Sequence, residues 1–188
     1  QEYDRFYAET SALLELSVAA TIYLEKIKDD IEFRRELNRS MPQLSKSYCG
    51  ITYTPSHGDF IYSQLICDKK GSIKKIVDFS SAHTVPISLE LMRFYMLSSA
   101  DCKTPGRFDM HLFKQYIANY MQFFPLSLND LKNMPIIYLY YMARNKYVYR
   151  EFLQSNGEKE TSFLQSSWRT DVCRFLYENA QKISEELV

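Results

Sequence analysis

Apolar residues in the first part of the chain recur at steps of three and four positions. The repeat runs through Leu13, Leu16, Ala20, Leu24 and Ile27. Such steps place side chains on one face of a helix, so the pattern predicts one amphipathic helix here. Asp29 and Asp30 can cap a second helix that continues through Leu37. Pro42 predicts the start of a third, shorter helical turn.

The pattern changes between residues 51 and 79, where short apolar runs replace the helical repeat. The two runs are residues 65–67 and 73–77, and residues 68–71 between them read Asp-Lys-Lys-Gly, which is typical of a turn. This part of the sequence predicts a small β-hairpin, and we expect it to be the only sheet of consequence.

Helical spacing returns after Pro86. We expect helices over residues 86–104, 109–123, 127–134 and 135–154. Ser127 and Asp130 form a capping pattern for the third of these, and Pro135 is expected to begin the fourth. Asn156 and Gly157 predict a turn before the last helix, which carries one apolar stripe: Leu164, Trp168, Val172, Phe175, Leu176, Ile183 and Leu187. The chain is therefore predicted to be a single mainly helical domain over residues 1–188, with one small embedded β-hairpin.

The composition argues against two classes of binding partner, nucleic acids and anionic membranes. The chain has 23 Lys plus Arg and 23 Asp plus Glu, so its formal net charge is zero. A neutral chain lacks the basic surface that binds nucleic acid or an anionic membrane, and we expect neither as a partner. No uncharged apolar run reaches the ~18 residues of a membrane span. No signal peptide opens the chain, which begins at Gln1, so we expect a cytoplasmic segment of a longer protein.

The four cysteines are isolated from one another: Cys49, Cys67, Cys102 and Cys173. None belongs to a C-x-x-C pair or has a histidine at metal-ligand spacing. We expect buried free thiols in a reducing compartment rather than a set of disulfides.

The segment with the most chemical information lies around the predicted hairpin. Asp59 precedes its first strand, Gln64 is near the start of that strand, and Asp78 follows the second strand. Antiparallel pairing places Gln64 within a residue or two of the position opposite Asp78. Carboxylate and amide oxygens suit Mg²⁺, which also takes water and phosphate oxygens. Asp59 could orient or deprotonate a hydroxyl, and its five-residue offset from Gln64 is similar to that in the catalytic loop of protein kinases.

These residues resemble a known family. His57-Gly58-Asp59, four residues and Gln64, followed by Val77-Asp78-Phe79, is similar to the motif pair of the aminoglycoside phosphotransferase/choline kinase family, distant relatives of protein kinases. Pro86 and Glu90 are similar to the proline and acidic residue that open the family's next helix. The order of helices extends the resemblance over essentially the whole chain, which implies the C-terminal lobe of a protein-kinase-like α+β phosphotransferase fold.

The resemblance also implies roles for individual residues. Asp59 is in the place of the catalytic aspartate that contacts the acceptor hydroxyl. Gln64 and Asp78 are in the places of the two Mg²⁺ ligands, with Gln64 replacing the usual asparagine but keeping the amide oxygen, as in maltokinase-like members. His57 is in the place of a buried histidine that supports the loop. The implied reaction is ATP-dependent phosphotransfer to the alcohol group of a small molecule of the aminoglycoside, choline or sugar type.

One departure from the family concerns the nucleotide. Phosphotransfer also needs a glycine-rich loop and a strand lysine, yet the five glycines never form Gly-x-Gly and no matching strand precedes His57. The N-terminal nucleotide-binding lobe is therefore expected to be absent from this chain and to be one of its partners. We expect the isolated chain to be inactive. The alternative is a kinase-like lobe that has lost catalysis and acts as a binding or scaffold module.

Overall fold

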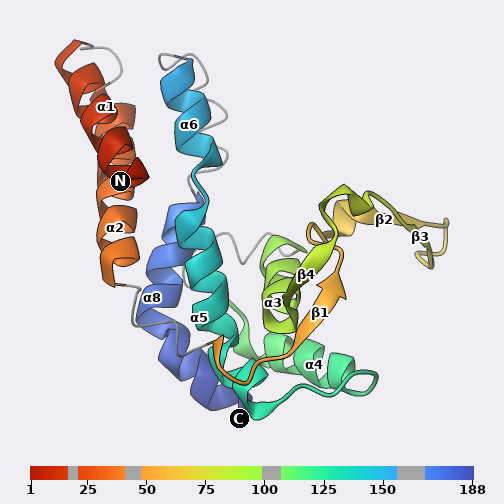
Figure 1. The fold of residues 1–188 in the computed structure, drawn as a ribbon. Helices are drawn as coiled ribbons and strands as arrows, with labels where there is room; N and C mark the ends of the chain where they lie inside the picture. Colours follow the sequence, from red (N-terminus) through yellow and green to blue (C-terminus); the bar gives the residue numbers. More distant parts are fainter. Residues whose placement is uncertain (17–20, 41–47, 99–106, 156–167) are drawn as a thin grey trace.

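A computed structural model describes residues 1–16, 21–40, 48–98, 107–155 and 168–188. Within these ranges the protein is mainly helical and carries two small antiparallel sheets of two strands each (Figure 1). The expected mainly helical class with an embedded hairpin is confirmed at this level. The second sheet was not expected.

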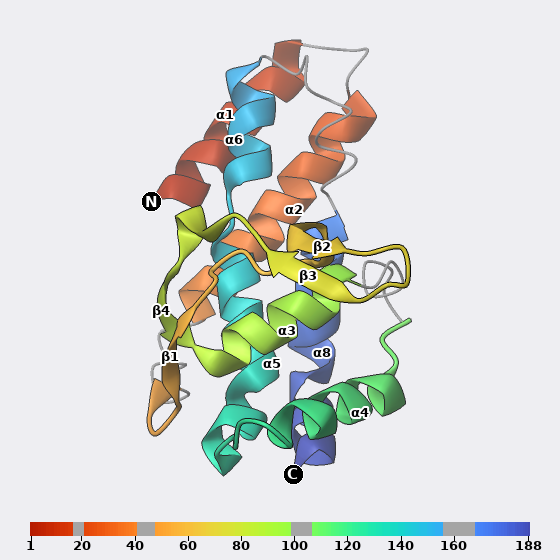
Figure 2. The same ribbon diagram turned by 90° about the vertical axis from the view of Figure 1, so that its right-hand side faces the viewer.

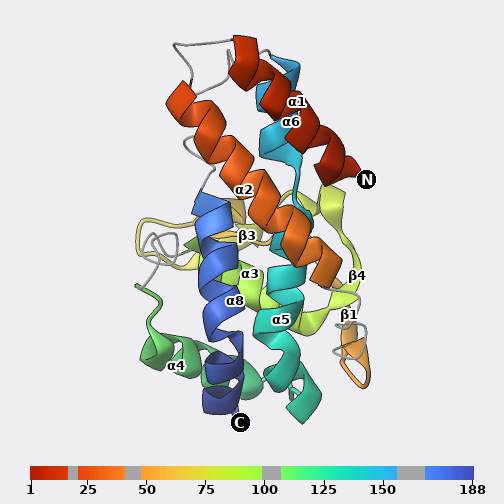
Figure 3. The ribbon, with the colours of Figure 1, turned by 90° about the vertical axis from the view of Figure 1, so that its left-hand side faces the viewer.

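The amino-terminal helices form an antiparallel pair. Helix α1 spans Glu2–Leu16 and helix α2 spans Thr21–Ser40, and both pack against α6, which spans Tyr147–Gln154 (Figure 3). The predicted single helix from Leu13 to Ile27 is wrong, because the apolar stripe serves two helices. Their shared cluster of buried side chains consists of Tyr3, Phe6, Leu24, Ile27, Ile31, Tyr149, Phe152 and Leu153.

The expected capping role of Asp29 and Asp30 is also wrong. Both residues lie in the middle of α2, which continues because its apolar positions extend past them to Ile31 and Leu37. Asp29 is exposed, whereas Asp30 is buried. The helical turn expected at Pro42 lies outside the described residues.

A larger core joins the remaining helices. Helix α3 spans Ile87–Ser98, α4 spans Met110–Met121, α5 spans Leu128–Arg144 and α8 spans Trp168–Leu187. Large side chains at their contacts are almost completely buried, including Met92, Met96, Phe113, Met134 and Tyr138. Burying side chains of this size stabilises the fold by about 1.5–3 kcal/mol each.

Helix α5 differs from the prediction because it begins before Pro135 and continues through it. Ser127 and Asp130 form a capping box that starts the helix, as expected. Proline removes one backbone donor, but the buried side chains of Met134 and Ile137 on either side hold both halves of the helix against the core. The helix ends at Arg144, so the predicted helix over 135–154 is divided between α5 and α6.

The two sheets enclose the motif segments. Strand β1 spans Tyr53–Ser56 and pairs with β4 at His83–Pro86, while β2 at Leu65–Cys67 pairs with β3 at Ile73–Ile76. The β2–β3 hairpin lies in front of α3, with α4 below it (Figure 2). The chain leaves β1, forms the hairpin and returns to pair with β1. Both motif segments therefore lie in the part of the chain between β1 and β4, the two strands that pair with each other.

A buried arginine links the two helical clusters. Arg34 on α2 donates hydrogen bonds to the Thr170 hydroxyl on α8, at 2.9 Å, and to the carbonyl oxygens of Met142 and Asn145, at 2.8 and 2.7 Å. Its guanidinium also lies over the Tyr149 ring. These contacts tie α2, α5, α6 and α8 together at one point.

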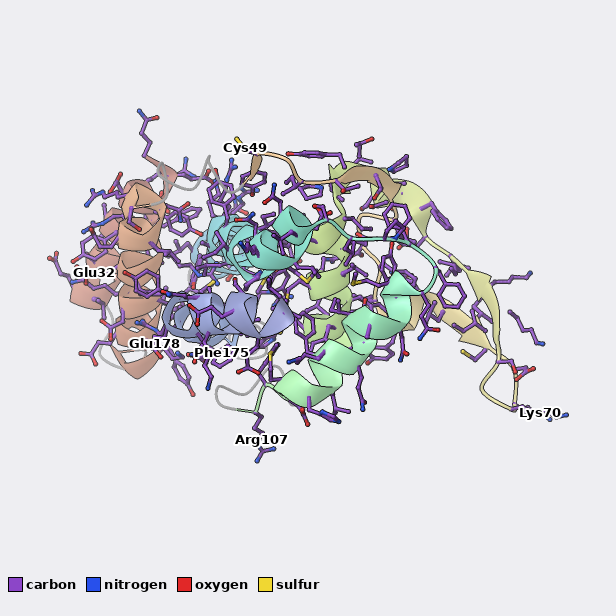
Figure 4. All side chains as sticks on the ribbon, turned by 90° about the horizontal axis from the view of Figure 1, so that it is seen from below. Glu32, Cys49, Lys70, Arg107, Phe175 and Glu178 are labelled. Atoms are coloured by element: carbon purple, nitrogen blue, oxygen red, sulfur yellow. The ribbon has the colours of Figure 1, made fainter. Side chains whose placement is uncertain are left out.

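Among the described cysteines, Cys173 is a buried free thiol as expected, but Cys49 and Cys67 are exposed free thiols (Cys49 is labelled in Figure 4). The expectation of burial is wrong for these two because they lie before β1 and at the tip of the hairpin rather than in the core. Cys102, Leu164 and the turn at residues 156–157 lie outside the described residues. No helix in the described ranges is both long and apolar enough to cross a membrane.

Candidate functional site

His57 fastens the loop after β1 to the end of the hairpin. The side chain is 8% exposed, and its Nε2 lies 2.7 Å from the carbonyl oxygen of Val77. Its ring also contacts Phe60 and Phe79, with centroids 5.6 and 4.6 Å away. A single buried imidazole therefore holds the two motif segments side by side, although they are about twenty residues apart in the sequence.

Gly58 allows this loop to approach the segment that follows Asp78. Its φ is +79°, and a β-carbon built at this position would lie only 1.9 Å from the backbone oxygen of Ser81. Only glycine fits without displacing the neighbouring backbone. The close approach keeps the Asp59 loop pressed against residues 79–83.

Gln64 and Asp78 meet at the open end of the hairpin. The Gln64 side-chain amide donates a hydrogen bond to Asp78 Oδ2 at 3.4 Å, and the Val77 amide donates to the Gln64 carbonyl at 3.0 Å. Leu65 pairs with Ile76, so Gln64 is one position away from facing Asp78. The expectation that Gln64 lies within a residue or two of the position opposite Asp78 is confirmed.

The backbone of Asp78 is unusual. Its φ of 63° and ψ of 61° place it in the left-handed region, which non-glycine residues seldom adopt. The Ser80 hydroxyl donates to Asp78 Oδ1 at 2.6 Å, and this hydrogen bond holds the pKa of the exposed carboxyl below its usual range. An acid with a lowered pKa is available as an anion over a wide range of pH. Strained backbone at an exposed anion is a feature frequently found at functional sites.

Asp59 has a partner that the sequence reasoning missed. Its carboxylate forms an ion pair with Arg93 of α3, and the same guanidinium donates to the carbonyl of Gly58 at 3.2 Å. Burial by itself lowers the pKa of Arg93, but the hydrogen bond to Asp59 and the further interactions with Asp59, Tyr141 and Tyr138 together raise it. A signal was present, since Arg93 is the only basic residue in the otherwise largely apolar α3 sequence.

The oxygen donors suit a weakly held divalent cation. Gln64 and Asp78 would supply two oxygen ligands, which leaves several positions for water or phosphate oxygens, as Mg²⁺ prefers. Among the described residues, no group of three or more His, Cys, Asp or Glu side chains could hold a metal ion.

Comparison with family models, with curated proteins and with solved structures returned no match. The assignment of roles to Asp59, Gln64 and Asp78 therefore depends on the sequence motif and on the contacts described above.

Proposed function

We propose that this chain is the C-terminal lobe of an ATP-dependent small-molecule kinase that transfers a phosphoryl group to an alcohol. One observation carries the proposal: the side chains of Gln64 and Asp78 meet at the open end of the hairpin. The His57 contact with Val77 holds the loop that contains Asp59 against the segment that contains Asp78. Kinase catalysis needs the same combination of two metal ligands and a nearby aspartate.

The placement of Asp59 supports a role toward the acceptor. Its side chain is 38% exposed, so solvent and a substrate can reach it. The ion pair with Arg93 uses Oδ1, and no described residue donates a hydrogen bond to Oδ2. In the proposed reaction Oδ2 accepts the hydrogen of the acceptor hydroxyl, orients that hydroxyl and takes its proton. Arg93, which also donates a hydrogen bond to the Gly58 carbonyl, keeps the carboxylate in position.

Gln64 and Asp78 would hold Mg²⁺ in this proposal. When bound, the metal neutralises charge on the nucleotide phosphates, which is the main electrostatic demand of phosphoryl transfer. The lowered pKa of Asp78 keeps its carboxylate available as a ligand near neutral pH. The hydrogen bond between Gln64 and Asp78 holds the two side chains together before a cation binds.

Two parts of a kinase site are not supplied by this sequence, namely a glycine-rich loop and a strand lysine. We propose that a separate N-terminal lobe contributes them. The 188-residue chain should then bind Mg-ATP weakly and show no measurable turnover, because a single preorganised donor to developing charge is worth about 3 kcal/mol.

The cation site can be tested on the chain itself with Mn²⁺ as a paramagnetic substitute for Mg²⁺. We expect Mn²⁺ to broaden the backbone NMR signals of residues around Gln64 and Asp78 before others. Asp78→Asn should abolish this local effect. Asp68→Asn is the matched control, because Asp68 is a carboxylate at the other end of the same hairpin, paired with Lys74 at 3.1 Å. Broadening spread evenly over all acidic residues, or unchanged in Asp78→Asn, would contradict the proposal.

The ion pair between Asp59 and Arg93 favours the alternative, a lobe that has lost catalysis and acts as a binding or scaffold module, because it occupies one oxygen of the proposed catalytic carboxylate. The Mn²⁺ experiment separates the two functions. A scaffold has no need to retain the cation site, so the absence of local broadening would favour it.

A further inference from the structure

A cavity of about 330 Å³ opens where the second half of α5 lies beside β4 and the start of α3. Ile137, Tyr140 and Tyr141 line this aromatic cavity from α5, and Tyr48 lines it from the segment before β1. Its volume is within the range of small-molecule binding sites. None of the residues proposed to carry phosphotransfer lines it, so the aromatic cavity is separate from that site.

Tyrosine rings form one wall of the aromatic cavity. The rings of Tyr48 and Tyr140 meet edge to face, with centroids 6.1 Å apart. Burial raises the pKa of Tyr48 to about 12, so this phenol is uncharged at physiological pH. An uncharged aromatic wall suits another ring, because aromatic pairs add a specific attraction to the burial of their surface.

Arg144 is the only Asp, Glu, Lys or Arg among the described residues that line the aromatic cavity. Its guanidinium lies over the Tyr140 ring, 5.1 Å from the centroid, and donates a hydrogen bond to the Tyr140 hydroxyl at 3.0 Å. It forms no ion pair with any residue in the described ranges. The contacts with Tyr140 hold the guanidinium in place and leave most of its N–H donors available.

The end of α5 is satisfied without this arginine. Basic side chains in the last turn of a helix often bond to its free carbonyl oxygens. Here Arg34 donates to the Met142 carbonyl at 2.8 Å, and the Tyr3 hydroxyl donates to the Ala143 carbonyl at 2.5 Å. Side chains from the amino-terminal helices therefore fill the capping role, and the charge of Arg144 is left for another partner.

Arg144 also lines a second cavity, of about 290 Å³, beside the amino-terminal helices. The charged side chains around this basic cavity comprise four basic and two acidic ones, namely Arg35, Arg39, Arg144 and Lys146 against Glu2 and Asp4. Asp4 forms ion pairs with Arg35 and Arg39, and Glu2 forms one with Lys146. Positive charge is in excess among these lining side chains, which favours an anion next to Arg144.

We propose that Arg144 binds the phosphate group of an aromatic phosphate ester, whose ring lies against Tyr48 and Tyr140 in the aromatic cavity. A guanidinium donates two parallel hydrogen bonds to phosphate oxygens, and the phosphate then faces the basic cavity. A phosphate monoester carries more negative charge near neutral pH than a carboxylate does, which matches the excess of basic side chains. A neutral aromatic compound would leave Arg144 without a counter-charge. This proposal does not depend on the proposed phosphotransfer.

The test compares phenyl phosphate with its two halves, phenol and inorganic phosphate, on the 188-residue chain. Benzoate, a ring with a single negative charge, is the fourth compound. Dissociation constants are measured by ligand-observed NMR at low salt and pH 7.5. We expect phenyl phosphate to bind about tenfold or more tightly than either half, and benzoate to bind more weakly than phenyl phosphate and more tightly than phenol.

Three variants locate the two parts of the site. Arg144→Met should reduce phenyl phosphate to the affinity of phenol. Arg5→Met is the matched control, because Arg5 is an exposed arginine on α1 that lines neither cavity and pairs with Glu9 at 3.5 Å. It should keep the full preference. Tyr48→Leu should weaken phenyl phosphate and phenol alike and leave inorganic phosphate unchanged. Thermal melts establish that all three variants fold.

Three results would overturn the proposal. Inorganic phosphate that binds as tightly as phenyl phosphate would mean that the basic side chains attract any anion and that the tyrosine wall plays no part. Benzoate that binds as tightly as phenyl phosphate would contradict the assignment of a phosphate group. Tight binding of phenyl phosphate that survives in Arg144→Met would place the anion elsewhere.

Discussion

Arg93 on α3 forms an ion pair with Asp59 in the loop that follows β1, and the same guanidinium reaches the Gly58 carbonyl. The arginine side chain is only 12% exposed, so the pair is shielded on one side. His57 holds the loop from the hairpin and Arg93 holds it from the helical core. The position of the Asp59 carboxylate is thus determined by two elements that lie after it in the sequence.

Arg93→Met tests the strength of this attachment. The variant keeps an apolar side chain of similar length but leaves Asp59 and the Gly58 carbonyl without their donor. We expect the free energy of unfolding, measured in urea, to fall by about 1–3 kcal/mol, below the value for a fully buried pair because Asp59 is partly exposed. Arg39→Met is the control, since Arg39 forms exposed ion pairs with Asp4 and Glu36. Its replacement should lower the free energy of unfolding by less than about 1 kcal/mol. Equal losses in both variants would show that the ion pair between Arg93 and Asp59 stabilises the fold no more than an exposed ion pair does.

Asp59→Asn and Asp78→Asn should differ in the complete enzyme that we propose. Asp59→Asn removes the group that orients the hydroxyl and takes its proton, so kcat should fall by about 10²–10⁴-fold at every Mg²⁺ concentration. Asp78→Asn weakens the cation site, so raising Mg²⁺ should restore part of its activity. The measurement is kcat for both variants over a Mg²⁺ titration, with thermal melts to verify folding. A near-normal kcat in Asp59→Asn would contradict the assignment of Asp59 as the catalytic residue.

Two glycines with similar backbone angles separate conformational strain from steric overlap. Gly58 and Gly71 have φ of +79° and +82°, but a β-carbon at Gly71 would meet no atom within 4 Å. Gly71→Ala should therefore lower the free energy of unfolding only by the cost of placing alanine in the left-handed conformation, about 1–2 kcal/mol. Gly58→Ala must also displace the Ser81 backbone, and we expect a loss of about 3–5 kcal/mol. Chemical denaturation of the two variants measures the difference, and similar losses would mean that the Asp59 loop does not pack closely on residues 79–83.

Asp30 should make stability depend on pH. Burial raises its pKa from 3.8 to about 6, despite Lys26 at 3.6 Å and Arg174 at 3.8 Å. Between these two pH values the folded state binds more protons than the unfolded state, so the contribution of Asp30 to stability falls as pH rises from about 4 to about 6 and then levels off. A shift of about two pH units corresponds to about 3 kcal/mol.

Asp30→Asn should remove this dependence. The unfolding free energy of the variant relative to the wild type should increase by about 1–3 kcal/mol between pH 4 and pH 7.5. Asp29→Asn is the matched control, because Asp29 is the exposed neighbour of Asp30 on the same helix. A constant difference for Asp30→Asn over this range would mean that Asp30 titrates normally in the folded protein.

The elements that the sequence predicted well are those with strong local patterns. Asp109 caps α4 and the Ser127–Asp130 box caps α5, because a cap and the residues that follow it are neighbours in the chain. The β2–β3 hairpin and the meeting of Gln64 with Asp78 followed from a short turn, which determines strand register. The prediction that Pro135 begins a helix was wrong, because tolerance of a proline within a helix depends on packing against other elements.

By itself, the sequence determined a mainly helical chain with one hairpin that carries an oxygen-rich motif at its open end. Only the tertiary structure decided that β1 pairs with β4, that Arg93 pairs with Asp59, and that Arg144 and Tyr48 line the same cavity. The physical reason is sequence distance. Periodicity, caps and tight turns are interactions between near neighbours, whereas each of these three relationships joins residues that are distant from one another in the sequence.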